Sequence, residues 1–95
     1  MQYNFISIKK KIIPLLKKNK IRKAGIFGSY ARGDTKKSSD LDLLVQIKGK
    51  KSLLDIVRLQ QMLEHHLNMH VDLLEYTEIH PYLKKKVLSE EVRIL

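Results

Sequence analysis

The sequence contains no cysteine, and no apolar run in its 95 residues approaches the length of a membrane-spanning helix. Without cysteine, disulfide bonds and thiolate metal sites are excluded, which suits a reducing compartment. The first residues, MQYNFISIKKKII, have no long apolar core followed by a small-residue cleavage site, so we expect no signal peptide. The sequence therefore predicts a cytoplasmic protein without membrane contact.

Acidic residues are also scarce, because 10 Asp and Glu stand against 19 Lys and Arg, for a net charge of +9. Such a balance favours anionic partners such as nucleic acid, nucleotides or an acidic protein surface, although solubility explains it equally well. The sequence has no aromatic-rich basic strand of the kind that stacks bases. We therefore do not expect nucleic acid as a specific ligand.

Apolar residues at helical spacing predict two main helices. The first covers residues 5–18, and Pro14 is expected to kink or split it. The second begins after Ser52, which has a capping-box partner in Asp55, and runs to about Leu67. Shorter helical segments are expected from Ser29 and within residues 77–90.

Three apolar stretches predict strands, at residues 21–27, 41–47 and 70–76. The closing EVRIL is a candidate for an edge strand. Helices that alternate with strands in a chain this short predict one α/β (α+β) domain over residues 1–95.

Two aspartates lie at the start of the second predicted strand, one directly before it and one within it, where an apolar run makes them unexpected. Side chains alternate along a strand, so Asp40 and Asp42 share one face, opposite the apolar residues between and after them. Like charges that close raise each other's pKa unless a cation lies between them, and Mg²⁺ is the usual cation. If the third strand pairs beside the second, Asp72 completes a three-carboxylate cluster, which is typical of two-metal nucleotidyl transfer. The alternative is that these aspartates end strands or lie on an exposed sheet face.

A Gly-Ser pair, Gly28 and Ser29, follows the first predicted strand. Glycine lets the backbone approach a ligand closely, and N–H groups at a helix start suit phosphate oxygens. Alone, the pair is equally a simple turn with Ser29 as N-cap. Arg32, on the same turn, either contacts a phosphate or lies in solvent. Together with the aspartates the pair forms Gly-Ser-x10-Asp-x-Asp, a much more specific pattern.

The segment GSYARGDTKKSSDLDLLV resembles the signature of the DNA polymerase β-like nucleotidyltransferase superfamily. The short chain resembles its minimal nucleotidyltransferase branch, prokaryotic proteins usually encoded beside a HEPN-domain partner as toxin–antitoxin pairs. VDLLEY is similar to the strand of the third carboxylate, and VLSEEVRIL to the usual close. The resemblance implies a small nucleotidyltransferase fold with a mixed sheet of three to four strands flanked by helices. Larger members carry a helical domain that is missing here, which suggests that a partner completes the site.

The resemblance also implies a reaction. Gly28 and Ser29 would hold the triphosphate of ATP, and Asp40 and Asp42 would bind two Mg²⁺ ions. Asp72 would bind the catalytic metal and help to take the proton from the acceptor hydroxyl. The implied acceptor is a tyrosine of the HEPN toxin, an RNase, which the attached AMP would silence. The protein would then be an antitoxin that acts as a protein adenylyltransferase.

Other interpretations remain open from the sequence. The chain could neutralise a toxin by binding alone, or act as a nucleic-acid-binding domain through its charge, or transfer nucleotides to RNA or a small molecule. Assembly could be homo-oligomeric or hetero-oligomeric with the toxin. We expect surface or interface positions, rather than a zinc site, for four histidines: His65, His66, His70 and His80. We expect amphipathic packing for three tyrosines: Tyr30, Tyr76 and Tyr82.

Overall fold

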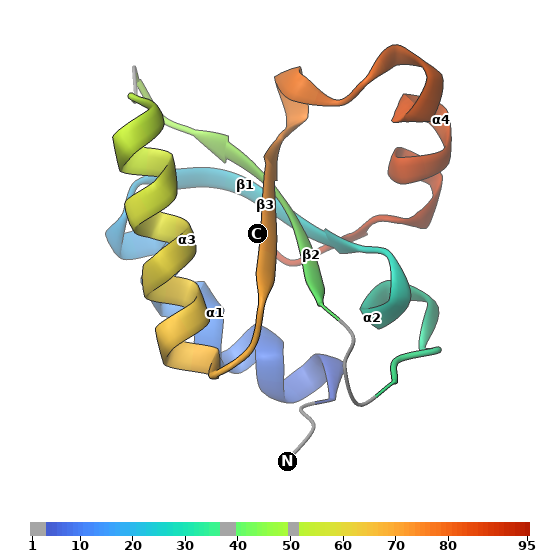
Figure 1. Cartoon of the computed structure of the whole chain (residues 1–95), viewed down its shortest axis with the longest axis horizontal. Helices are drawn as coiled ribbons and strands as arrows, with labels where there is room; N and C mark the ends of the chain where they lie inside the picture. The colour runs from blue at the N-terminus through green and yellow to red at the C-terminus, as the bar shows by residue number, and fades with distance from the viewer. Residues whose placement is uncertain (1–3, 37–39, 50–51) are drawn as a thin grey trace.

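The computed structural model describes residues 4–36, 40–49 and 52–95 (Figure 1). In chain order the elements are α1 (Phe5–Lys18), β1 (Ile21–Phe27), α2 (Ser29–Arg32), β2 (Leu41–Ile47), α3 (Leu53–Leu67), β3 (Val71–Glu75), the 3-10 turn η1 (Tyr76–Glu78), α4 (Pro81–Glu90) and β4 (Val92–Arg93). Within these ranges, no helix has both the length and the apolar character that crossing a membrane requires.

The four strands form one mixed sheet in the order β3-β2-β1-β4. β1 pairs antiparallel with β2 and with β4, whereas β2 and β3 are parallel and are connected by α3. The expected α+β class, with a mixed sheet flanked by helices, is therefore confirmed. The edge strand expected in the closing EVRIL is also present, as β4 beside β1.

The core lies between the sheet and the helices α1 and α3, while α4 lies on the opposite side of the strands from α3 (Figure 1). One turn after another of α1 and α3 directs an apolar side chain inward, at the spacing that the sequence predicted. Alternate residues of β2 face these helices, and Asp42 and the buried Leu44 lie on the opposite face of the strand. The central members of this core are Ile8, Ile12, Leu16, Leu41, Leu43, Val45, Leu59, Leu63 and Leu67.

The helix α1 is a single element over Phe5–Lys18, as predicted, but the expected split at Pro14 was wrong. Pro14 lies on the exposed side of the helix. The carbonyl of Lys10, which loses its partner four residues on, is therefore open to water. At the start of the helix, the Asn4 side chain accepts a hydrogen bond from the Ser7 backbone N–H at 2.8 Å.

The helix α3 begins with the predicted capping box. The Ser52 backbone N–H donates to the Asp55 carboxylate at 3.0 Å, and the Asp55 N–H donates to the Ser52 hydroxyl at 3.2 Å. The helix ends at Asn68, which adopts the left-handed conformation with φ 53°. The chain then turns directly into β3, which places the third carboxylate strand beside β2.

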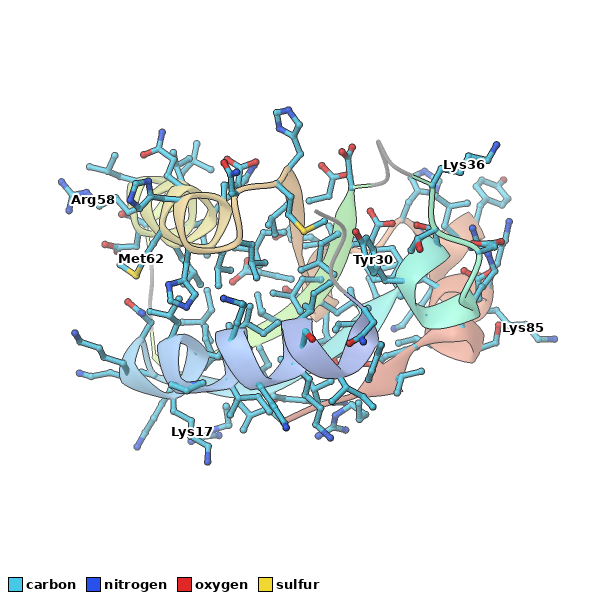
Figure 2. All side chains as sticks on the ribbon, turned by 90° about the horizontal axis from the view of Figure 1, so that it is seen from below. Lys17, Tyr30, Lys36, Arg58, Met62 and Lys85 are labelled. Carbon is cyan, nitrogen blue, oxygen red and sulfur yellow. The ribbon has the colours of Figure 1, made fainter. Side chains whose placement is uncertain are left out.

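Two predictions near the C-terminal half need correction. The third strand was expected over residues 70–76 but covers Val71–Glu75, because Tyr76 already belongs to η1. Tyr82 was expected to pack but is 91% exposed and stacks only on the ring of His80, at a centroid separation of 5.4 Å. Tyr30, by contrast, is buried in the core as predicted (Figure 2). The four histidines have exposed side chains, as expected for surface positions.

Candidate active site

The sheet face opposite the core brings the candidate carboxylates together. Leu41 and Leu43 of β2 are fully buried on the core side, so Asp42 between them faces the other way. β3 runs parallel to β2 with Asp72 directly opposite Asp42. Residues opposite each other on neighbouring strands have their side chains on the same face, so these two carboxylates are neighbours. Asp40 precedes β2 and borders the same space.

This space is a cleft of about 470 Å³. It contains all six of the sequence-predicted site residues, which come from the turn after β1, from α2, from β2 and the residue before it, and from β3. It also contains four residues of α4 that the sequence analysis did not identify. The lining residues are Phe27, Gly28, Ser29, Arg32, Asp40, Asp42, Asp72, Leu83, Lys86, Val87 and Glu90.

Gly28 shapes the floor of this cleft. Its backbone φ of +73° is one that residues other than glycine rarely adopt. A Cβ atom at this position would also overlap the Asp42 carboxylate. Ser29 begins α2 directly afterwards, and the backbone N–H groups of Ala31 and Arg32 both donate to the Gly28 carbonyl. Glycine at this position therefore lets the turn of α2 press against the acidic residues.

Burial raises the pKa of the Asp42 carboxyl to about 6, and the neighbouring Asp72 and then Asp40 add to the rise. Arg32 acts in the opposite direction, but its effect is the smallest. The folded protein thus keeps the carboxylates of Asp42, Asp72 and Asp40 close together, which lowers its free energy of unfolding when they are ionised. That arrangement is expected where a cation is to be bound.

The crowding of these carboxylates predicts that asparagine at position 42 stabilises the metal-free protein at neutral pH. Because the folded-state pKa of Asp42 is about 6 and its ordinary value is 3.8, stability falls as pH rises from about 4 to 6. Asp42→Asn removes this loss, worth about 1 kcal/mol at pH 7.5 after allowance for solvent screening. Urea unfolding of both proteins in metal-free buffer at pH 7.5 and pH 4 measures it. If the two proteins had equal free energies of unfolding at pH 7.5, or differed by the same amount at pH 7.5 and pH 4, the raised pKa of Asp42 would be contradicted.

Arg32 lines the cleft, and its exposed side chain is held by two carboxylates. Its Nε atom donates to Asp34 at 3.1 Å, and a terminal nitrogen donates to Glu90 at 3.1 Å. The second contact joins α2 to α4 across 58 residues of sequence. The remaining N–H groups of the guanidinium are available to a ligand.

The donor set of the cleft fits a hard divalent cation. Carboxylate oxygens are the ligands that Mg²⁺ prefers, and this ion is usually held by one or two of them, with water and substrate phosphates completing its shell. Across residues 4–36, 40–49 and 52–95, no group of three or more His, Asp or Glu side chains is placed so that it could hold a metal ion by itself. Water and substrate phosphates would therefore have to complete the coordination of a Mg²⁺ ion bound in this cleft.

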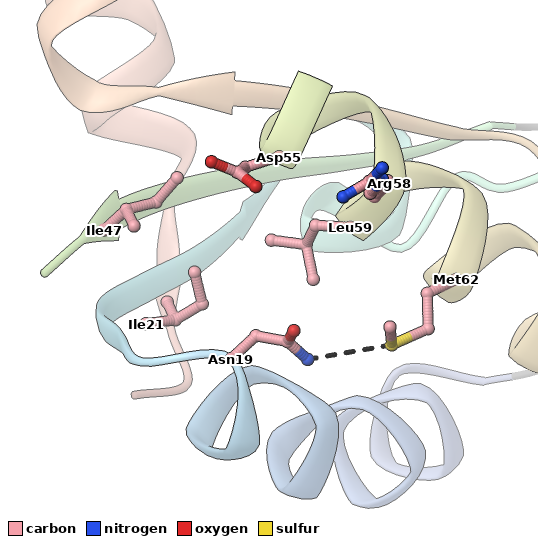
Figure 3. A pocket seen from close by; sticks show the side chains of 7 residues that line it. All are labelled: Asn19, Ile21, Ile47, Asp55, Arg58, Leu59 and Met62. Atoms are coloured by element: carbon pink, nitrogen blue, oxygen red, sulfur yellow. Dashed lines mark hydrogen bonds between the residues drawn. The ribbon is translucent and has the colours of Figure 1, made fainter. Parts of the chain in front are cut away.

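A second hollow of about 160 Å³ lies at the other end of β1 (Figure 3). Its lining is Asn19, Ile21, Ile47, Asp55, Arg58, Leu59 and Met62. The carboxylate of Asp55 is engaged in the capping box, and the amide of Asn19 lies 3.7 Å from the sulfur of Met62. This hollow lacks grouped carboxylates, so the acidic cleft is the better candidate for catalysis.

The comparisons with known proteins agree with this geometry. The polymerase beta nucleotidyltransferase family matches residues 10–95. The chain belongs to this family. A Methanocaldococcus jannaschii relative, whose provisional name is protein adenylyltransferase, is 51% identical over 92 residues, covering 97% of this chain and 99% of the relative. The predicted enzyme class, a nucleotidyltransferase related to protein adenylyltransferases, is thereby confirmed.

Two solved structures of nucleotidyltransferase systems superpose well. A toxin–antitoxin crystal structure with AMP-PNP has a TM-score of 0.81 at 28% identity, over 92% of this chain and 72% of that one. A complex of tri-AMPylated Shewanella oneidensis HEPN toxin with its MNT antitoxin has a TM-score of 0.75 at 25% identity, over 95% and 71%. The predicted resemblance to minimal nucleotidyltransferases of toxin–antitoxin systems is therefore confirmed.

Proposed function

We propose that this nucleotidyltransferase transfers AMP from ATP to a hydroxyl group, a tyrosine of a HEPN toxin, and so acts as the antitoxin of the pair. The observation that carries the proposal is the cleft, in which Asp42 and Asp72 lie opposite each other beside the Gly28–Ser29 turn. The Shewanella oneidensis complex, whose HEPN toxin carries AMP, supports the choice of acceptor. ATP as substrate and the lack of cysteine support a cytoplasmic setting.

In the proposed reaction each side of the cleft has its own role. The Gly28–Ser29 turn binds triphosphate oxygens through backbone N–H groups and the serine hydroxyl, and Arg32 adds a contact from α2. The bond between the α- and β-phosphates breaks as the acceptor oxygen attacks the α-phosphate, and pyrophosphate leaves. Because the attack occurs at the α-phosphate, the group transferred is AMP and not the terminal phosphate.

The three aspartates are proposed to hold two Mg²⁺ ions, with Asp40 and Asp42 binding both and Asp72 binding the catalytic ion. When bound, these ions neutralise phosphate charge and make a hydroxyl acidic enough to react near neutral pH. Asp72, like Asp40, has an exposed side chain, and we propose that it also accepts the proton of the entering hydroxyl. Asp42 is the more buried of the two, and its carboxylate lies against Gly28, which fixes its position beside Asp72.

The position of the label in ATP tests the proposed reaction. The protein is incubated with the product of the adjacent gene, which we expect to be a HEPN protein, in Mg²⁺ buffer, using ATP labelled at either the α- or the γ-phosphate. We expect only the α-label to appear on the HEPN protein and pyrophosphate to be released. Removal of divalent metal with EDTA should abolish labelling, and added Mg²⁺ should restore it.

Each other outcome identifies a different function. A label transferred from the γ-phosphate would show a kinase, and labelling that persists in EDTA would contradict the role of the aspartates. A stable complex without labelling would show an antitoxin that acts by binding alone. Label that appears instead on added RNA or on an aminoglycoside would change the acceptor but keep the reaction.

A further inference from the structure

One face of α4 is turned toward the acidic cleft. Leu83, Lys86, Val87 and Glu90 all line it, at the i, i+3, i+4, i+7 spacing that places four residues on one side of a helix. None of the residues of α4 is buried, so this helix contributes little to the core. Packing of α4 against the core therefore does not determine which residue stands at position 86, at the centre of this face.

The cleft has few cations for its charge. Among the described residues, four carboxylates line it, from Asp40, Asp42, Asp72 and Glu90, and two cations, Arg32 and Lys86. Arg32 is already shared between Asp34 and Glu90. Within the described part of the chain, no carboxylate lies within 4.0 Å of the Lys86 ammonium. Of the two cationic residues that the structure describes in the cleft, Lys86 is thus the one without a carboxylate partner.

The position of Lys86 is tied to the Gly-Ser turn. Glu90 lies one helical turn after Lys86 on the same face, and the 3.1 Å contact between Glu90 and Arg32 joins α4 to α2. Because α2 begins at Ser29, this contact holds Lys86 on the wall that faces the predicted phosphate-binding turn. A lysine provides a compact charge on a flexible stem, which suits a phosphate group.

We propose that Lys86 binds the β- and γ-phosphates of ATP, so that α4 forms the second wall of the nucleotide site. This inference rests on the proposed function and adds a binding residue from a segment outside the Gly-Ser and aspartate motifs. It follows that binding of the triphosphate, and not of the nucleoside, depends on the charge at position 86. The released pyrophosphate keeps the same contact until it leaves.

Calorimetric titration of ATP and of AMP, with Mg²⁺ present, tests the proposal on four proteins: the unmodified chain, Lys86→Ala, Lys86→Arg and Lys85→Ala. Lys86→Ala should raise the Kd of ATP about tenfold, as expected for one lost charged hydrogen bond, and leave the Kd of AMP unchanged. Lys86→Arg should retain most of the ATP affinity. Lys85→Ala removes the same charge from the next residue, which points away from the body of the molecule, and should bind ATP normally (Figure 2).

Three results would overturn the proposal. One is an ATP affinity of Lys86→Ala equal to that of Lys85→Ala, and another is an equal loss of ATP and AMP affinity. The third, a failure of the unmodified chain to bind ATP, would remove the proposed function as well. AMP transfer by the unmodified chain, together with normal ATP binding by Lys86→Ala, would remove this inference alone. Circular dichroism of each variant checks that the helix content of the whole chain is unchanged.

Discussion

Replacing Asp42 with asparagine should lower the rate of AMP transfer by about three orders of magnitude. Asp42 is the central carboxylate of the cleft, with Asp72 opposite it on β3 and Asp40 before it in the chain. Asparagine keeps the shape but loses the charge, and its amide group presents hydrogen atoms to a cation. Initial rates of α-label transfer to the HEPN protein measure the effect.

The control for this variant is Glu78→Gln, which changes net charge equally at an exposed position of η1 outside the cleft. It should transfer AMP at the normal rate. Because Asp42→Asn is also expected to be the more stable protein at pH 7.5, its inactivity would not be a result of unfolding. Transfer by Asp42→Asn within tenfold of normal would show that the chemistry takes place elsewhere.

Replacing Gly28 with alanine should reduce both stability and transfer. The backbone at Gly28 has φ +73° and ψ −151°, a conformation nearly confined to glycine, and the added methyl group would overlap the Asp42 carboxylate. The backbone strain alone is expected to lower the free energy of unfolding by about 2 kcal/mol. Displacement of Asp42 should make transfer undetectable even in the folded protein. Urea unfolding and rate measurements at a temperature where the variant is folded separate the two effects.

Gly49→Ala is the matched control, because Gly49 also has a positive φ of +79° but a Cβ there would meet nothing within 4 Å. It should lose stability through its backbone alone and keep full activity. If Gly28→Ala were as active as Gly49→Ala, the close approach of the α2 turn to Asp42 would have no catalytic role.

Local patterns in the sequence predicted the parts of the fold that depend on local interactions. The bounds of α1, the alternation along β2 and the capping box at Ser52 follow from spacing and hydrogen bonding within a few residues. The pairing of β3 beside β2 was a conditional expectation, and the parallel register confirms it. The same pairing places Asp72 directly beside Asp42 on the sheet face opposite the core.

Contacts between distant residues were beyond these patterns. The pair of Arg32 with Glu90 depends on where α4 is placed, and nothing near either residue in sequence indicates the other. A similar case is the Tyr76 hydroxyl, which donates to the Glu91 carboxylate over Gly25, a glycine whose Cβ would overlap that side chain. Sequence spacing alone showed a helix in α4 but not which partner its face meets.

The most direct test of the central claim is the intact mass of the HEPN protein after incubation with this chain, ATP and Mg²⁺. We predict a mass increase of one or more AMP groups, located on a tyrosine, that is absent when Asp42→Asn replaces the unmodified chain. An unchanged mass, in a mixture where the two proteins form a stable complex and ATP is bound, would contradict the account. The protein would then neutralise its partner by binding and not by chemistry.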